Sequence, residues 1–179
     1  GLKYIATELD LPVVKVSSGD LNNPLILLAA AGSGKNIILS TGMSTLTEIE
    51  SALGILAFGY LGQSDKPSLK KFKEAWDERS ARKAVLEKVT VLQCTTEYPT
   101  PVEDANLNAM LTIRDKFGVK VGYSDHSIGN LAALISVSLG ASIIEKHFTI
   151  DKNYSDFRDH QLSSDFNDMK ELVLNVKRV

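Results

Sequence analysis

The sequence alternates short runs of mainly β-branched residues with longer helical patterns, and a polar corner follows each run. This order is typical of βα repetition, in which parallel strands pack against the helices that connect them. The runs are almost continuously apolar, as expected for strands buried on both faces. We predict five strands, over residues 13–17, 36–40, 89–93, 119–123 and 142–146.

Between these strands, apolar residues recur at helical spacing and predict helices. A possible capping box of Thr45 with Glu48 opens one helix, and two others end at Gly118 and Gly140, which we interpret as C-terminal caps. Further helices are expected over residues 21–31, entered through Pro24, after Ser164, and at the N-terminus, where Leu2, Ile5 and Leu9 have helical spacing.

The segment 66–88 breaks this rhythm, because twelve of its twenty-three residues are charged. Leu69, Phe72, Trp76 and Leu86 lie at helical spacing within it and predict one extra surface helix. Such a helix is either a solvated amphipathic helix without chemistry or a docking surface for another subunit.

The length of each βα unit limits the architecture. A closed (β/α)₈ barrel needs ~250 residues, or about 31 for each unit. The 179 residues here, without the charged insertion, supply only five units. The predicted fold class is therefore α/β, either a partial TIM barrel or a small open sheet, and a chain that starts within a helix favours the partial barrel.

Charge and cysteine content narrow the classes of partner. The chain has 20 Lys and Arg residues against 22 Asp and Glu residues, a formal net charge of −2. A chain with this charge balance lacks the broad basic face that binding of nucleic acids or anionic membranes requires. No apolar stretch reaches the roughly 18–20 residues of a membrane span. Cys94 is the single cysteine, which argues against disulfides and cysteine zinc sites. We expect a soluble, cytoplasmic protein.

In parallel α/β folds, ligands bind at the carboxyl ends of the strands. Two histidines end successive predicted strands here. Side-chain alternation places Glu145 and His147 on one face of their strand, and likewise Ser124 and His126 on one face of theirs. If the strands are neighbours at ~4.8 Å, both imidazoles could bind one divalent ion such as Mn²⁺. Each histidine could instead be a hydrogen-bonded rim residue, and His160 is interpreted as a surface residue.

Other corner residues suit an anion. Lys15 lies within an apolar strand, where burial of its ammonium group without an anion would be costly. Ser18, Ser40 and Ser124 could add hydroxyl donors around a phosphate, or could instead cap the following helices. The carboxylates of Asp20, Glu145 and Asp159 are candidate acids, bases or ligands of substrate hydroxyls, and equally candidate helix caps or ion-pair partners.

Taken in order, the motifs at the ends of the predicted strands resemble those of the sialic acid synthase family. This family includes N-acetylneuraminate synthase and the bacterial legionaminic and pseudaminic acid synthases. The resemblance spans nearly the whole chain apart from segment 66–88. Its motifs are KVSSGD at 15–20, ILSTGM at 38–43, Cys94-Thr95 with YPTP at 98–101 and Glu103-Asp104, GYSDH at 122–126, and IEKHFT at 144–149.

The resemblance implies a fold and a reaction. Family members are homodimers with a TIM barrel and a small antifreeze-like domain that reaches over the partner's active site. This chain would cover barrel strands four to eight, without the first three strands or the small domain, and is expected to be inactive alone. Members are transferases that condense phosphoenolpyruvate with N-acetylmannosamine or a related acetamido hexose, releasing phosphate and a nine-carbon 2-keto acid. The implied metal is Mn²⁺ or Mg²⁺.

The resemblance also implies residue roles. His126 and His147 would hold the metal, Asp20, Tyr98 and Asp159 would contact the sugar or assist proton transfer, and Glu145 is the further catalytic candidate. The residues implied to bind phosphoenolpyruvate are Lys15, Ser18, Ser40, Thr96 and Ser124.

Some positions depart from the pattern of the family. Asp20 stands where many members have Glu, Thr96 where Asn is common, and Gln93 where His is common. Phe157-Arg158 stands where many relatives have Gly-Pro, so we expect shifted sugar contacts there.

Two alternative functions remain. The first is another phosphoenolpyruvate-dependent synthase, such as the 3-deoxy sugar acid synthases. The Ser-Asp-His and Glu-Lys-His-Phe-Thr motifs argue against this alternative. The second is a non-catalytic module that binds phosphoenolpyruvate.

Overall fold

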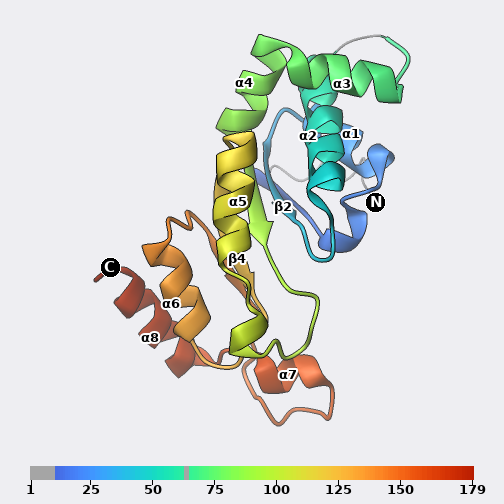
Figure 1. The fold of residues 1–179 in the computed structure, drawn as a ribbon. Coiled ribbons are helices and arrows are strands. Elements are labelled where there is room, and N and C mark those ends of the chain that lie inside the picture. The colour runs from blue at the N-terminus through green and yellow to red at the C-terminus, as the bar shows by residue number, and fades with distance from the viewer. Residues whose placement is uncertain (1–10, 63–64) are drawn as a thin grey trace. The chain divides into compact units, whose positions relative to one another are not determined.

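The computed structural model describes residues 11–62 and 65–179, so the helix expected at Leu2, Ile5 and Leu9 lies outside the described residues. Strands and helices alternate along the chain (Figure 1). The strands are β1 (Val13–Val16), β2 (Asn36–Ser40), β3 (Val89–Gln93), β4 (Lys120–Asp125) and β5 (Ile144–Lys146). The helices are α1 (Pro24–Gly32), α2 (Leu46–Tyr60), α3 (Leu69–Asp77), α4 (Arg79–Lys88), α5 (Asn108–Phe117), α6 (Leu131–Ser138), α7 (Arg158–Leu162) and α8 (Phe166–Val176).

The five strands form one sheet, and their order in the sheet is their order in the chain. Strand β1 pairs in parallel with β2, and β4 pairs in parallel with β5, where Asp125 lies opposite Lys146. Helices connect consecutive strands, as the alternating sequence pattern predicts. The predicted strands agree with the observed ones to within two residues at either end. These features confirm the prediction of five βα units.

The described residues divide into two compact units, the first made of residues 11–62, 65–91 and 117–120 and the second of 92–116 and 121–179. In the first unit, α2 lies next to α1 (Figure 1) and buries a continuous apolar face that includes Ile49 and Leu53. The predicted capping box opens α2, because Thr45 Oγ1 accepts a hydrogen bond from the amide of Glu48 and the Glu48 carboxylate accepts one from the amide of Thr45.

The charged segment 66–88 forms two helices, α3 and α4, so the prediction of one helix is wrong. Glu78 has an extended backbone between them, and its carboxylate accepts hydrogen bonds from the amides of Ser80 and Ala81 as the N-cap of α4. The apolar face of α3 is buried, since Phe72 meets Phe58 edge-on at 5.4 Å and Trp76 meets Phe117 at 6.5 Å.

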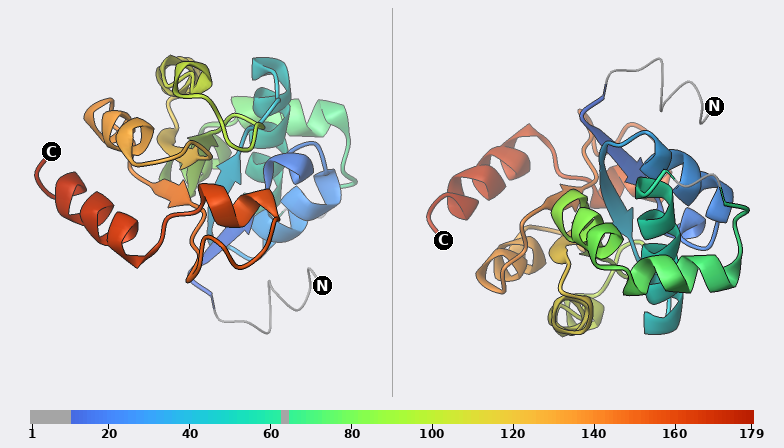
Figure 2. Two further views of the ribbon diagram at one scale, coloured as in Figure 1. Left: turned by 90° about the horizontal axis from the view of Figure 1, so that it is seen from below. Right: turned by 90° about the horizontal axis from the view of Figure 1, so that it is seen from above.

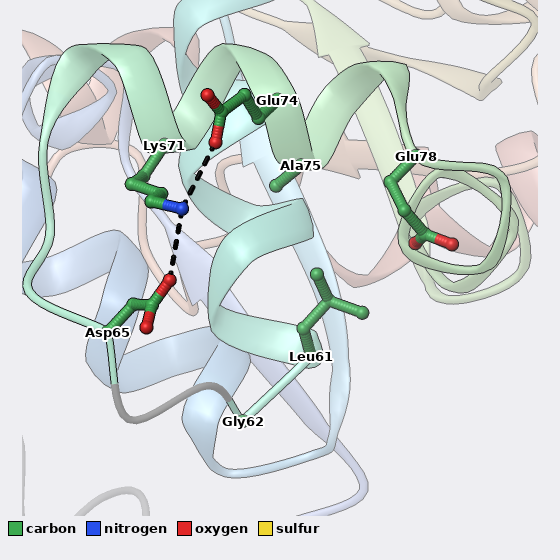
Figure 3. A pocket seen from close by; sticks show the side chains of 7 residues that line it. All are labelled: Leu61, Gly62, Asp65, Lys71, Glu74, Ala75 and Glu78. Carbon is green, nitrogen blue, oxygen red and sulfur yellow. Dashed lines mark ion pairs between the residues drawn. The ribbon is translucent and has the colours of Figure 1, made fainter.

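A cavity of about 510 Å³ in the first unit lies beside α2 and α3 (Figure 3). Its charged groups largely satisfy one another, because the ammonium of Lys71 lies 3.1 Å from Asp65 and 3.2 Å from Glu74. Glu78, also in its lining, is engaged in capping α4. None of the site residues predicted from the sequence lines this cavity.

The second unit packs helices α6 and α8 side by side (Figure 2). Tyr123 of β4 is fully buried there. Gly122 is required beside it, since an added Cβ atom would lie 2.5 Å from the carbonyl oxygen of Ile143. Helix α8 is capped by Asp165 in a capping box with Asp168, which corrects the predicted start at Ser164.

Both glycines predicted as helix ends have positive φ, +74° at Gly118 and +96° at Gly140, as such caps require. Within the described residues, no helix combines the length and apolar character needed to cross a membrane.

Candidate functional site

The carboxyl ends of β4 and β5 gather four of the predicted site residues. Strand register places Ser124 opposite Glu145, and the Ser124 hydroxyl donates a 2.8 Å hydrogen bond to the Glu145 carboxylate. His126 and His147 follow two residues later on the same faces, with ring centroids 5.5 Å apart and planes at 72°. The predicted convergence of the two histidines is therefore confirmed.

The surroundings of His126 decide which ring nitrogen is available. Its Nδ1 lies 2.7 Å from the carbonyl oxygen of Thr95. A carbonyl oxygen can only accept, so Nδ1 carries the proton and Nε2 keeps its lone pair. Burial lowers the pKa of His126, which favours the neutral imidazole that metals bind.

The ring of Tyr98 packs against the rings of both histidines. It stacks on His126 at 4.2 Å and meets His147 edge-on at 5.9 Å. Partial burial is the main cause that raises the pKa of Tyr98 above its usual value, so its phenol remains protonated at neutral pH. The Tyr98 phenol therefore keeps a hydrogen that it can donate.

Helix α7, which follows β5 after a loop, adds charged groups to this cluster (Figure 1). Asp159 Oδ2 lies 3.8 Å from Nδ1 of His147, and Arg158 Nε lies 3.9 Å from Asp159 Oδ1. The Arg158 guanidinium also lies 5.2 Å from the centre of the Tyr98 ring. Asp159 is one of the residues predicted for the site, whereas Arg158, which directly precedes it, was noted only as a departure from the family pattern.

Two more residues that sequence analysis missed lie on the opposite side of the same strands. Asp125 and Lys146 form an ion pair of 2.8 Å, and both side chains are buried. Their positions are a signal in the sequence, since each immediately precedes one of the two histidines.

The predicted residues of the first unit differ in exposure. Lys15 is exposed, so the premise of a buried ammonium group is wrong; its Nζ donates to the carbonyl oxygen of Val16 at 3.2 Å. Ser18 and Asp20 lie in a short 3₁₀ turn, Ser18–Asp20, where Asp20 accepts a 2.8 Å hydrogen bond from Ser17. Ser40 is buried, yet its hydroxyl has no hydrogen-bond partner among the described residues.

The three serines do not cap the helices that follow them, so this alternative is wrong for α1, α2 and α6. Asn23 caps α1 and Thr45 caps α2 through their side chains, and Asn130 occupies the N-cap of α6. None of these caps is Ser18, Ser40 or Ser124.

Two predicted residues lie at the margin of the second unit. Thr96 is exposed. His160 is half-buried, and its Nδ1 lies 2.9 Å from the Thr149 hydroxyl, so it is more anchored than the surface residue we expected.

The histidines fit part of a metal site. Within residues 11–62 and 65–179, no three side chains of His, Cys, Asp or Glu come together as a metal-binding group. The donors present are two imidazoles, one with a fixed tautomer, and two nitrogen ligands with open positions suit a divalent ion that also binds substrate oxygen atoms.

Comparison with known proteins assigns the family. The model of the NeuB family matches residues 2–179. The chain belongs to the NeuB family. This member is 38% identical over 175 residues to the N,N'-diacetyllegionaminic acid synthase of Campylobacter jejuni, covering 98% of this chain and 45% of that protein. It is 34% identical over 171 residues to the pseudaminic acid synthase of Helicobacter pylori, covering 96% and 43%.

A solved structure supports the fold of this NeuB family member. The N-acetylneuraminic acid (sialic acid) synthetase from Leptospira borgpetersenii matches with a TM-score of 0.74 and 33% identity, over 96% of this chain and 50% of that one. The chain thus spans about half the length of the relatives it matches. The predicted family and the predicted partial (β/α)₈-barrel fold class are both confirmed.

Proposed function

We propose that the full-length protein is a nonulosonic acid synthase. In this proposal it condenses phosphoenolpyruvate with N-acetylmannosamine or a related acetamido hexose and releases phosphate and a nine-carbon 2-keto sugar acid. The observation that carries the proposal is the His126–His147 pair under Tyr98, in a chain similar to legionaminic and pseudaminic acid synthases. We place this transferase in the cytoplasm as a homodimer with small-molecule substrates only.

On the acceptor side, the residues of the second unit have separate roles. A divalent ion, Mn²⁺ or Mg²⁺, held by His126 and His147 would polarise the aldehyde oxygen of the open-chain sugar. The Thr95 carbonyl oxygen keeps Nε2 of His126 available. Tyr98 donates a hydrogen bond to the sugar, and the carboxylates of Asp159 and Glu145 accept from its hydroxyls or take up a proton.

We assign the binding of phosphoenolpyruvate to Lys15, Ser18, Ser40, Thr96 and Ser124, the residues that the family resemblance implies. The buried Ser40 hydroxyl, which has no hydrogen-bond partner among the described residues, supports this role, because such a donor gains a bond when an anion binds. Asp20, with its carboxylate oriented by Ser17, is assigned to the sugar.

The proposed reaction forms a C–C bond and breaks the C–O bond to phosphate. Carbon 3 of phosphoenolpyruvate forms a bond to the aldehyde carbon, water adds at carbon 2, and phosphate leaves with cleavage of the C–O bond. The residues contribute by holding both substrates and by placing donors where the aldehyde oxygen gains negative charge.

Phosphate release tests this function. The full-length protein is incubated with Mn²⁺, phosphoenolpyruvate and, separately, N-acetylmannosamine, a 2,4-diacetamido-6-deoxy hexose or arabinose 5-phosphate. We expect release with an acetamido sugar. Release only with arabinose 5-phosphate would instead support a 3-deoxy sugar acid synthase, and binding of phosphoenolpyruvate without release would support a binding module.

A further inference from the structure

The ends of β4 and β5 are joined by a buried ion pair that no step above uses. Lys146 Nζ donates to Asp125 Oδ2 at 2.8 Å, and the two side chains are 2% and 0% exposed. Asp125 and Lys146 are also register partners in the parallel strands. The ion pair therefore adds a side-chain link where the backbones are already paired.

Ser127 completes a closed network around this pair. Asp125 Oδ1 accepts hydrogen bonds from the Ser127 amide at 2.9 Å and the Ser127 hydroxyl at 2.7 Å. Lys146 Nζ donates a second bond, to the Ser127 carbonyl oxygen at 2.8 Å. The network thus encloses the backbone on both sides of His126 and ties it to the residue that precedes His147.

Stability alone is a weak explanation for such a pair. Two charges lose their hydration when they are buried, and apolar replacements of similar volume are often no less stable. What the pair does provide is a fixed geometry, because both oxygens of Asp125 are bonded and Lys146 is bonded twice.

The remaining anchors of the histidines depend on this fixed backbone. The His126 carbonyl oxygen accepts from the Thr100 amide at 2.9 Å, and the His147 carbonyl oxygen accepts from the Ser164 amide at 2.8 Å. These bonds tether each histidine separately. Two side-chain links join the segment of one histidine to that of the other: the Ser124–Glu145 hydrogen bond, two residues before each histidine, and the Asp125–Lys146 pair, directly before them.

We propose that Asp125 and Lys146 are positioning residues that set the separation and orientation of His126 and His147, and through them the affinity for a divalent ion. This inference rests on the metal role given to the histidines in the proposed function. Outer partners that orient metal-binding histidines typically change affinity by about 10–100-fold when removed.

The test is a Mn²⁺ titration of the metal-free full-length protein, followed by electron paramagnetic resonance of unbound Mn²⁺. We expect Lys146→Met to raise the Mn²⁺ dissociation constant by about 10–100-fold. Asp125→Asn keeps the size of the side chain and an oxygen that can accept from Ser127, so it serves as the second variant if Lys146→Met does not fold. We expect about a tenfold increase from Asp125→Asn.

Leu172→Ala is the matched control, because Leu172 is buried in α8 and its loss lowers stability without removing an anchor of the histidines. Thermal unfolding is measured for each variant, and Leu172→Ala is expected to leave Mn²⁺ affinity within about twofold of the wild type. Equal loss of affinity in this control would overturn the proposal, as would unchanged affinity in Lys146→Met and Asp125→Asn.

A readout without metal separates this inference from the proposed function. Nitrogen NMR of the histidines should show the Nδ1-protonated form of His126 in the wild type and altered signals of both histidines in Lys146→Met. A wild type that binds Mn²⁺ but makes no sugar acid would refute the proposed function and leave the positioning result standing. A wild type that binds no Mn²⁺ would refute the positioning of a metal site.

Discussion

The strand ends of the two units differ in how their side chains are held. At β4 and β5, Ser124 is bonded to Glu145, His126 to the Thr95 carbonyl, and Tyr98 is stacked on His126. At β1 and β2, Lys15 is exposed and the Ser40 hydroxyl has no partner among the described residues. The second unit therefore presents a cluster of side chains in contact with one another, whereas the first presents an exposed ammonium group and a buried hydroxyl.

Replacement of a histidine is expected to have the largest effect. His147→Ala in the full-length protein removes one of the two imidazoles, and we expect kcat/KM for both substrates to fall by about 10²–10³-fold, the loss typical of a group that stabilises developing charge. Phosphate release measures it. A decrease in kcat/KM below threefold, in a variant that is still folded, would show that the histidine pair does not take part in the reaction.

The next largest effect concerns the hydroxyl of Tyr98. Tyr98→Phe keeps the ring that stacks on His126 and removes only the hydrogen-bond donor, so we expect about a tenfold lower kcat/KM for the sugar. Steady-state kinetics with the acceptor varied gives this value. Tyr98→Leu removes the ring as well and should lose more; equal activity of Tyr98→Phe and wild type would assign Tyr98 a packing role alone.

A pair of serine substitutions tests the contrast between the units directly. Ser124→Ala leaves the Glu145 carboxylate without one of its hydrogen bonds and should lower the free energy of unfolding by about 1–2 kcal/mol. Ser40→Ala removes a buried hydroxyl that has no described partner, so the ligand-free protein should lose no stability while KM for phosphoenolpyruvate rises. Denaturant unfolding compares the two, and equal destabilisation would contradict the account.

The smallest effect is a pH dependence at α8. A hydrogen bond from Lys152 holds the pKa of Asp168 below its usual value. Asp168 therefore contributes stability above about pH 3.8, and this contribution is lost as the pH falls through its lowered pKa. Lys152→Met should destabilise the protein at pH 7 and have little effect near pH 2, as urea unfolding at both pH values would show. A pH-independent difference would argue against this ion pair.

Much of the fold is predictable because the information is local. Apolar runs fix the strands, and Thr45 with Glu48 marks the start of α2. The break at Glu78 was missed, because the charged helical pattern continues across it and only the backbone conformation ends the helix. Lys15 was misjudged, because an apolar strand does not reveal which of its positions faces solvent.

The site was predictable where alternation alone decides it. His126 and His147 converge because each ends a strand on a defined face. The link between Asp125 and Lys146 was missed, because it depends on the register of two strands that are 21 residues apart in the chain. Arg158 was missed because its place over Tyr98 depends on the path of the loop before α7.

The most direct test follows oxygen atoms during the reaction of the full-length protein with phosphoenolpyruvate, an acetamido hexose and Mn²⁺ in ¹⁸O-labelled water. We expect equal amounts of a nine-carbon 2-keto sugar acid and of phosphate without solvent oxygen, because the C–O bond of phosphoenolpyruvate breaks. Pyruvate together with ¹⁸O-labelled phosphate would contradict it, since that outcome is hydrolysis of phosphoenolpyruvate at phosphorus without condensation.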